Sequence, residues 1–199
     1  MAAAGAAHVA TEITFSEAVA FRVSAGVALV VIAYLVRRVR RLPNILRAWG
    51  MRRDNFRECL WPHLAFAAVG LPALVALGAA LDPLALPPTF WLVLGLYPLW
   101  GIAQQFALQN LLARNVAALV PNRFAIATTA AVLFAAAHYP RLDLVGLTLV
   151  SGFAFTLLYL RWPNLWAVGI SHGILGTVAA YLVVREDPGA LILDSLLGR

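Results

Sequence analysis

Long apolar stretches separated by short polar segments make up most of this chain. At about 20 residues per bilayer crossing, this pattern predicts about six membrane helices, and the fourth and fifth of them are short enough to form a hairpin around residues 139–143. The sequence therefore predicts an all-α fold, a polytopic integral membrane helix bundle in one domain over residues 1–199. The predicted helices lie near residues 18–36, 60–81, 89–112, 124–139, 144–160 and 164–184.

The segment 42–59, between the first two apolar stretches, mixes Arg with large apolar residues. Such a mixture is typical of an amphipathic helix that lies on a membrane surface. Trp49, Met51 and Phe56 suit the boundary between lipid and water. We therefore predict one interfacial helix here, and an ordinary connecting segment is the alternative.

Composition supports the membrane assignment and excludes a soluble domain. Hydrophobic residues make up 62% of the 199 residues and charged residues 12%, and the mean hydropathy is +0.83. All 15 basic residues are Arg, against 9 acidic residues. Eight of the arginines lie in residues 37–57, directly beside an apolar stretch. This position indicates a topology signal and a contact for the lipid bilayer, and it argues against nucleic-acid binding.

The distribution of Arg predicts an orientation. Loops 37–59, 113–123 and 161–163 carry eleven arginines between them. By the positive-inside rule these loops are cytoplasmic. With six helices, both termini then lie outside. The sequence thus predicts a multi-pass protein of the cell's inner (plasma) membrane.

Three glutamines interrupt the third apolar stretch. Gln105 and Gln109 are four residues apart and share a helix face, whereas Gln104 lies about 100° around from Gln105. A single Gln in a membrane helix often only joins two helices. Three within six residues favour a polar cavity lined by their side chains, since polar groups in hydrocarbon are costly.

Two histidines lie in later apolar stretches. His138 follows Phe134 by one turn, and His172 lies among small residues that let helices approach closely. Each histidine alone could be a satisfied core residue. With the glutamines, a shared pocket is the better interpretation, and His138 and His172 are its candidate acid–base or hydrogen-bonding pair. The predicted ligand-binding residues are Gln104, Gln105, Gln109, Phe134, Ser171 and Gly176.

Metal, cofactor and disulfide chemistry are not predicted. Two histidines without a third good ligand fall short of the usual three or four ligands of a metal site. The only cysteine, Cys59, cannot form an internal disulfide. We expect no cofactor.

The order and spacing of these residues resemble the CPBP superfamily, which comprises CAAX prenyl proteases and bacteriocin-processing intramembrane proteases. The likeness extends over about residues 49–184. The family pattern is Glu-Glu-x-x-x-Arg, then Phe-x-x-x-His, then His-x-x-x-Asn. Phe134, His138 and His172 match it. Gln104, Gln105 and Gln109 stand at the Glu, Glu and Arg positions, and Gly176 stands at the Asn position.

The resemblance implies an intramembrane site that acts on a prenylated or otherwise hydrophobic substrate. In the family, the glutamates and histidines are thought to activate water against a peptide bond. A carboxamide cannot accept a proton as a general base does. The replacement of the whole charged set by neutral amides therefore removes the family's hydrolytic base while it keeps hydrogen-bonding shape.

Three hypotheses follow. The first is a member that has lost hydrolysis and uses an altered Gln/His cavity to bind or transform a lipid-like, isoprenoid-like or prenylated ligand, with both histidines pointing into a ligand-sized cavity. The second is a working endopeptidase with water held between His138 and His172. The third is a non-catalytic scaffold or subunit for a membrane-protein partner, with the glutamines bonded to one another. We favour the first.

Overall fold

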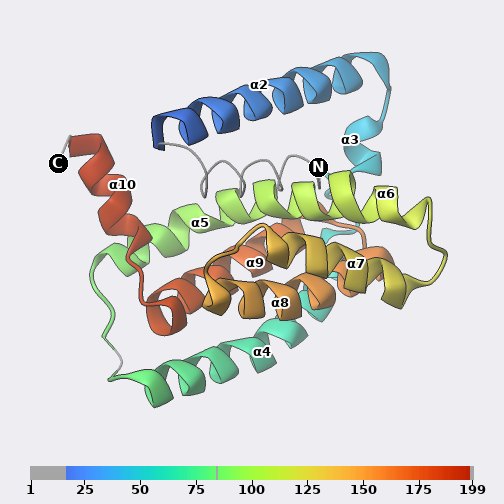
Figure 1. Cartoon of the computed structure of the whole chain (residues 1–199). Coiled ribbons are helices and arrows are strands. Elements are labelled where there is room, and N and C mark those ends of the chain that lie inside the picture. Colours follow the sequence, from blue (N-terminus) through green and yellow to red (C-terminus); the bar gives the residue numbers. More distant parts are fainter. Residues whose placement is uncertain (1–16, 84, 198–199) are drawn as a thin grey trace.

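Helices form every regular element in the part of the chain that the computed structural model describes, residues 17–83 and 85–197 (Figure 1). The prediction of an all-α membrane bundle is confirmed. The elements are α2 (Glu17–Arg41), α3 (Ile45–Ala48), α4 (Phe56–Leu81), α5 (Thr89–Phe106), the π-helical segment η1 (Ala107–Ala113), α6 (Arg114–Ala117), α7 (Arg123–Ala136), α8 (Leu142–Arg161), α9 (Leu165–Ala179), the π-helical segment η2 (Ala180–Val184) and α10 (Pro188–Leu197).

Four helices among the described residues are long and apolar enough to cross a membrane. They are α4, the continuous helix Thr89–Ala117, α8, and the continuous helix Leu165–Val184. Helix α7 has 14 residues, which gives a length of about 21 Å, less than the hydrocarbon core of about 30 Å. The predicted span 18–36 lies within α2. Helix α10 follows the last predicted span and was not predicted.

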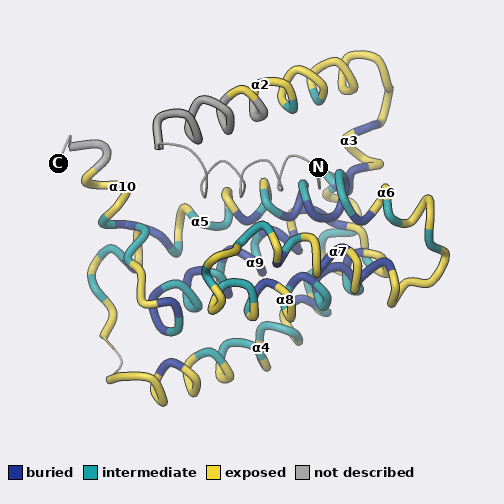
Figure 2. Tube along the Cα trace, viewed as in Figure 1, coloured by how far each residue is buried: buried dark blue, intermediate teal, exposed yellow. Residues whose placement is uncertain are grey.

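Helix α9 is the centre of the bundle. In the Leu165–Val184 helix, 72% of the most apolar stretch is buried, against 11% in α4. Figure 2 shows the contrast, with α9 mostly dark blue and α4 largely yellow and teal. Helix α9 packs against α5 and α4, while α7 packs against α8. Of the other elements that carry predicted site residues, α5 therefore packs directly against this most buried helix, whereas α7 packs against α8.

Glycines bring α5 and α9 into backbone contact. A Cβ atom at Gly101 would lie 2.5 Å from the carbonyl oxygen of Gly169 and 2.9 Å from the backbone nitrogen of Gly173. The predicted small-residue contact on α9 is thus confirmed, and its partner is α5. This close approach lets short polar side chains on the two helices reach one another.

The predicted continuous surface helix over residues 42–59 is wrong: only α3, which has four residues, and the first turn of α4, which begins at Phe56, are helical there. Gly50 has a φ of 74°, a left-handed conformation that ends the helix. Its carbonyl accepts from the backbone nitrogen of Leu165 at 2.8 Å, and the carbonyl of Trp49 accepts from the Tyr159 hydroxyl at 2.8 Å. Trp49 is buried, edge-on to Phe106. Contacts to the bundle therefore replace helical hydrogen bonds and membrane-surface contacts in this segment.

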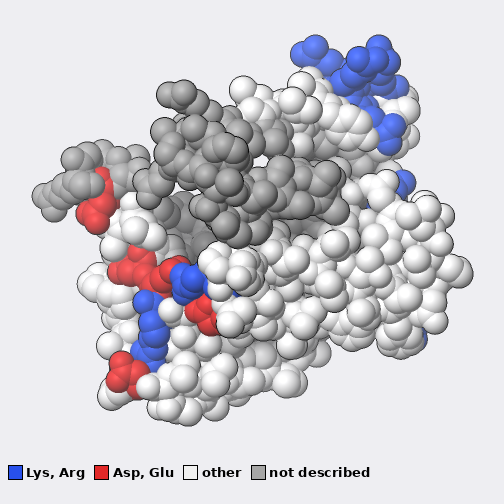
Figure 3. All heavy atoms as spheres, viewed as in Figure 1, with Lys and Arg blue, Asp and Glu red and all other residues white. Residues whose placement is uncertain are grey.

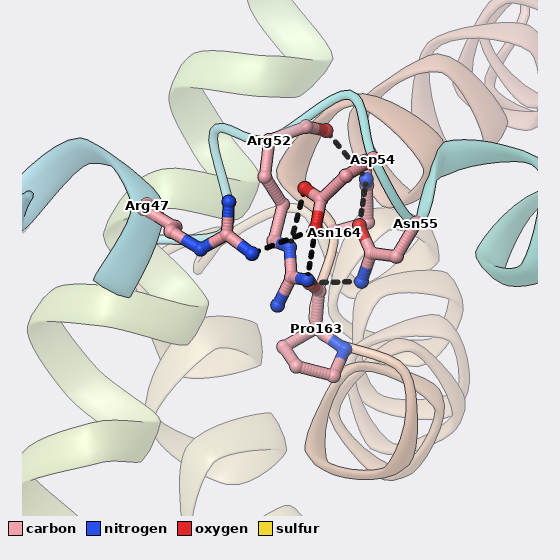
Figure 4. Close-up of polar contacts among 6 residues, drawn as sticks. All are labelled: Arg47, Arg52, Asp54, Asn55, Pro163 and Asn164. Carbon is pink, nitrogen blue, oxygen red and sulfur yellow. Dashed lines mark hydrogen bonds and ion pairs between the residues drawn. The ribbon is translucent and has the colours of Figure 1, made fainter.

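Hydrogen bonds of Asn164 join the segment 42–59 to the start of α9 (Figure 4). Its side-chain nitrogen donates to the carbonyl of Arg52 and to the side-chain oxygen of Asn55, both at 2.8 Å. Its side-chain oxygen accepts from the backbone nitrogen of Ala167 and caps the helix. Asn164 is fully buried, and its bond to the nitrogen of Ala167 is buried while the bonds to Arg52 and Asn55 are partly buried.

Asp54 lies in the same cluster. It accepts from Arg52 and Arg47 (Figure 4). The hydrogen bond from Arg52 lowers the pKa of the Asp54 carboxyl to about 2. The ion pairs therefore persist at neutral pH.

We expect Asn164→Ala to lower the thermal stability of the purified protein more than Asn122→Ala. Both asparagines cap a helix, but Asn122 is exposed and only caps α7. Loss of a cap alone costs about 0.5–2 kcal/mol. Asn164→Ala also removes the donor of two partly buried oxygens, those of Arg52 and Asn55, and full burial of such a group without a partner would cost about 1–3 kcal/mol. Melting temperatures in detergent check this, and equal losses would contradict the role given to Asn164.

The Arg-bearing loops lie at one end of the bundle. Arg114 donates to the carbonyl of Ala48, and Asn55 donates to the carbonyl of Pro163. Arg141 pairs with Asp143 and Glu186 at the other end. Figure 3 shows blue atoms alone at one end and mixed red and blue atoms at the other. This arrangement agrees with the prediction that loops 37–59, 113–123 and 161–163 lie on one side of the membrane. The termini, residues 1–16 and 198–199, lie outside the described residues.

Helix α10 is held at that second end by Asp187. Its carboxylate accepts from the hydroxyls of Thr89 and Tyr181, at 2.7 and 2.6 Å, and from the backbone nitrogen of Ala190. These bonds join the start of α5, the end of η2 and α10. The chain after the last predicted span is therefore part of the bundle.

Candidate functional site

The three predicted glutamines lie where α5 passes into η1. Gln105 and Gln109 are 0% and 2% exposed, and Gln104 is half-buried. Gln105 and Gln109, which share a helix face, therefore both face the bundle interior. The wider π-helical turn buries three consecutive residues, Leu108, Gln109 and Asn110. π-helical turns of this kind are frequent at functional sites.

His172, on α9, is hydrogen-bonded through both ring nitrogens. The side-chain nitrogen of Gln105 lies 2.9 Å from Nδ1, and the side-chain oxygen of Gln104 lies 2.8 Å from Nε2. Because an amide nitrogen donates and an amide oxygen accepts, Nδ1 carries the lone pair and Nε2 carries the proton. The imidazole is therefore neutral and fixed in one tautomer.

Gln109 extends this arrangement to a chain of hydrogen bonds. Its nitrogen donates to the oxygen of Gln105 at 2.9 Å. The order of donation is then Gln109 to Gln105, Gln105 to His172, and His172 to Gln104. We call these four residues the Gln–His cluster. It contains no carboxylate, and between Asp82 and Glu186 the sequence has only Asp143, which pairs with Arg141 at a helix end.

The bonding of His172 limits its chemistry. Its single lone pair, on Nδ1, is already used by Gln105. The ring cannot accept a proton from water, or bind a metal ion, unless that bond first breaks. Among the described residues, no group of three or more His, Cys, Asp or Glu side chains could hold a metal ion.

Aromatic rings form the apolar side of the cluster. The centroid of Phe155 lies 5.5 Å from that of His172, and the centroid of Phe134 lies 6.4 Å from it. Phe134 is also edge-on to His138, at 4.9 Å. The predicted Phe134 thus contacts both predicted histidines.

His138 is not bonded to the Gln–His cluster. It follows the last turn of α7, is half-buried, and its Nδ1 donates to the carbonyl of Phe134 at 2.9 Å. In the described part of the chain, no hydrogen bond reaches its Nε2. The two histidines are therefore linked through Phe134 and by no direct hydrogen bond.

Ser171 and Gly176 occupy the other predicted positions on α9. Ser171 is buried, and its hydroxyl oxygen has no partner among the described residues. A Cβ atom at Gly176 would lie 2.9 Å from Cε1 of Tyr97 and 3.9 Å from Cδ2 of His172. The Tyr97 ring therefore takes the space into which a side chain at position 176 would extend.

Sequence reasoning missed three polar residues next to the cluster. The Thr156 hydroxyl, fully buried on α8, lies 3.4 Å from the nitrogen of Gln109. Asn110 donates to the carbonyl of Trp49 at 3.2 Å and to the Tyr159 hydroxyl at 3.4 Å. Asn110 directly follows Gln109, so its place beside the other amide residues could have predicted that it lies near the site. A threonine in a membrane helix gives no such signal, because its hydroxyl is readily satisfied by its own helix.

Two polar atoms on the site's helices lack partners within the described structure. They are the side-chain oxygen of Gln109 and the hydroxyl oxygen of Ser171, both fully shielded. An unpaired buried polar group costs about 1–3 kcal/mol. Each is an acceptor that a donor group could still satisfy.

Comparison of the sequence with models of known protein families gives one match. Residues 86–178 match the family model described as Rce1-like, type II CAAX prenyl endopeptidase. Searches of curated proteins and of solved structures found no match. The matched region contains every predicted site residue.

Proposed function

This chain belongs to the CPBP superfamily, and we propose that it is a member that binds a hydrophobic, lipid- or isoprenoid-like ligand inside the membrane without hydrolysing peptide bonds. The site is the Gln–His cluster with Phe134, His138, Ser171 and Gly176. His138 and His172 serve as hydrogen-bonding groups, His172 within the cluster and His138 through its Nε2, which has no partner in the described part of the chain.

The bonding of His172 carries the proposal. Both ring nitrogens are bonded to glutamine amides, at 2.9 and 2.8 Å. A hydrolase needs a group that takes a proton from water, and loss of a general base lowers the rate typically by about 10²- to 10⁴-fold. Neutral amides at positions 104, 105 and 109 cannot supply that group. The second hypothesis, in which one of the two histidines is the base, would require the His172 ring to leave Gln105 or would rest on His138, which is not bonded to the cluster.

Unpaired acceptors support the ligand-binding part. The oxygens of Gln109 and Ser171 are buried without partners among the described residues. The hydroxyl or other donor group of a lipid-like molecule would satisfy either of them. Phe134 and Phe155 would contact its apolar part, as aromatic side chains commonly do in ligand sites.

A scaffold that binds a membrane-protein partner is the second candidate function. The observation that favours it is the bond between Gln109 and Gln105 at 2.9 Å, because amides that satisfy one another can serve helix packing alone. This candidate predicts no bound small molecule.

The orientation belongs to the same proposal. We place the protein in the cell's inner membrane with the Arg-rich loop 37–59 in the cytoplasm, on the strength of the positive-inside rule. Contacts between Arg114 and Ala48 and between Asn55 and Pro163 support a common side for the three Arg-bearing loops.

Native mass spectrometry of the protein purified in mild detergent tests the function. We expect the wild type to retain a lipid- or isoprenoid-like molecule that the double variant His138→Ala/His172→Ala loses. Thr129→Ala, which removes an exposed hydroxyl from α7, is the matched control and should retain the ligand. Ser171→Ala removes a hydroxyl whose oxygen has no partner in the described structure, so it should fold normally and weaken retention.

The outcomes separate the candidates. A ligand lost in the double variant and weakened by Ser171→Ala supports binding at the cluster. No ligand in the wild type or any variant, with unchanged melting temperatures, overturns it in favour of the scaffold. Cleavage of a prenylated peptide by the wild type would overturn both.

A further inference from the structure

A second possible binding site lies where α2, α3 and α5 meet. An apolar cavity of about 340 Å³ is present there, near the lower end of the range of about 300–1,000 Å³ for ligand sites. Val36 and Val39 line it from α2, Leu46 from α3 and Phe106 from α5. Arg40 is the only charged residue that lines it.

This cavity is separate from the Gln–His cluster. None of the four cluster residues lines it. Val36, Val39 and Leu46 are each exposed by about two-fifths (43%, 42% and 43%), so the cavity is open at the surface. Val36 ends the predicted span 18–36, and Val39 and Leu46 follow it in the chain, so the opening lies near the predicted boundary between membrane and cytoplasm.

Positive charge lies at the same end of α2. Arg37, Arg38, Arg40 and Arg41 are exposed, and none of them forms an ion pair with a carboxylate within residues 17–83 and 85–197. Arg47, by contrast, is paired with Asp54. Figure 3 shows these blue atoms without red atoms beside them on the face in view. An anionic group at the mouth of the cavity would meet uncompensated charge.

We propose that this cavity binds one acyl chain of an anionic phospholipid, with the lipid phosphate held by Arg40. The apolar walls suit the acyl chain. The single charged lining residue suits the phosphate, and the neighbouring arginines raise the local concentration of anionic lipid. The site goes beyond the proposed function, because it needs none of the Gln–His cluster.

Lipid titration of the detergent-solubilised protein, followed by native mass spectrometry, tests the site. The probes are dioleoyl phosphatidylglycerol and dioleoyl phosphatidylcholine, which share acyl chains and differ in charge. We expect the wild type to prefer phosphatidylglycerol and Arg40→Ala to bind it about fivefold more weakly. Arg38→Ala is the matched control, about 160° around the same helix, and should change binding less than twofold.

Two further variants fill the cavity. Val39→Trp and Leu46→Trp replace exposed side chains, and either should lower binding of both lipids while the melting temperature is unchanged. Equal binding of the two lipids by the wild type, or an Arg38→Ala loss as large as that of Arg40→Ala, would overturn the proposal. His138→Ala/His172→Ala should keep phosphatidylglycerol binding, so failure of one site is distinguishable from failure of the other.

Discussion

Gly101→Ala is expected to destabilise the protein by about 1–3 kcal/mol or more, the range for overpacking of a tight core. The added Cβ atom would lie 2.5 Å from the carbonyl oxygen of Gly169 and 2.9 Å from the backbone nitrogen of Gly173. Both atoms belong to a helix backbone, so no side chain can rotate away, and α5 must separate from α9. The separation would also lengthen the bond between Gln105 and His172.

Gly95→Ala is the matched control on the same helix. A Cβ atom at position 95 meets nothing within 4 Å, and alanine favours a helix over glycine by about 1 kcal/mol. Its stability should be unchanged or slightly higher. Unfolding by sodium dodecyl sulfate, followed by circular dichroism, measures both variants. A Gly101→Ala protein as stable as Gly95→Ala would refute the backbone contact.

Gln105→Leu is expected to have the next largest effect, a loss of about 1–3 kcal/mol for each group that it leaves unpaired. The substitution keeps the approximate size of the side chain and removes both bonds that it makes. Nδ1 of His172 loses its donor, and the nitrogen of Gln109 keeps only the longer bond to the Thr156 hydroxyl, at 3.4 Å. All of these groups are buried.

A double-mutant cycle isolates the amide–amide bond. Gln109→Leu alone leaves the oxygen of Gln105 unpaired, and the double variant Gln105→Leu/Gln109→Leu removes both amides of that bond. We expect the double variant to lose less stability than the sum of the two single losses, by about 0.6 and at most about 1.7 kcal/mol. Gln104→Leu is the control at a half-buried position with one bond to His172, and should cost less than Gln105→Leu. Strict additivity would show that Gln105 and Gln109 act independently.

The stability of the cluster bears on the proposed absence of hydrolysis. A carboxylate pair in the same place would carry buried charge, which is costly unless it is paired and hydrogen-bonded. The amides keep a hydrogen-bonded chain through His172 with no net charge. Under the proposed function, the amides that cannot act as a general base therefore also keep the helices joined.

The sequence by itself determined the membrane bundle and identified most of the residues of the candidate site. Apolar stretches of spanning length are a local property, and they placed α4, the Thr89–Ala117 helix, α8 and the Leu165–Val184 helix. Polar residues inside such stretches stand out because hydrocarbon offers no alternative hydrogen-bond partner. For that reason Gln105, Gln109 and His172 were recognised, and the structure bonds them together.

Only the tertiary structure decided which groups pair and which segments turn inward. The mixture of Arg and large apolar residues over 42–59 fits a surface helix, but hydrogen bonds from Leu165, Tyr159 and Asn164 hold the part between α3 and α4 against the bundle. The sequence likewise did not show that Thr156 and Phe155 lie beside the cluster, or that His138 is not bonded to it. These contacts join residues far apart in the chain, and they depend on how the helices cross and on the close packing at the glycines. Hydrophobic periodicity indicates only the local conformation and the buried face of each helix.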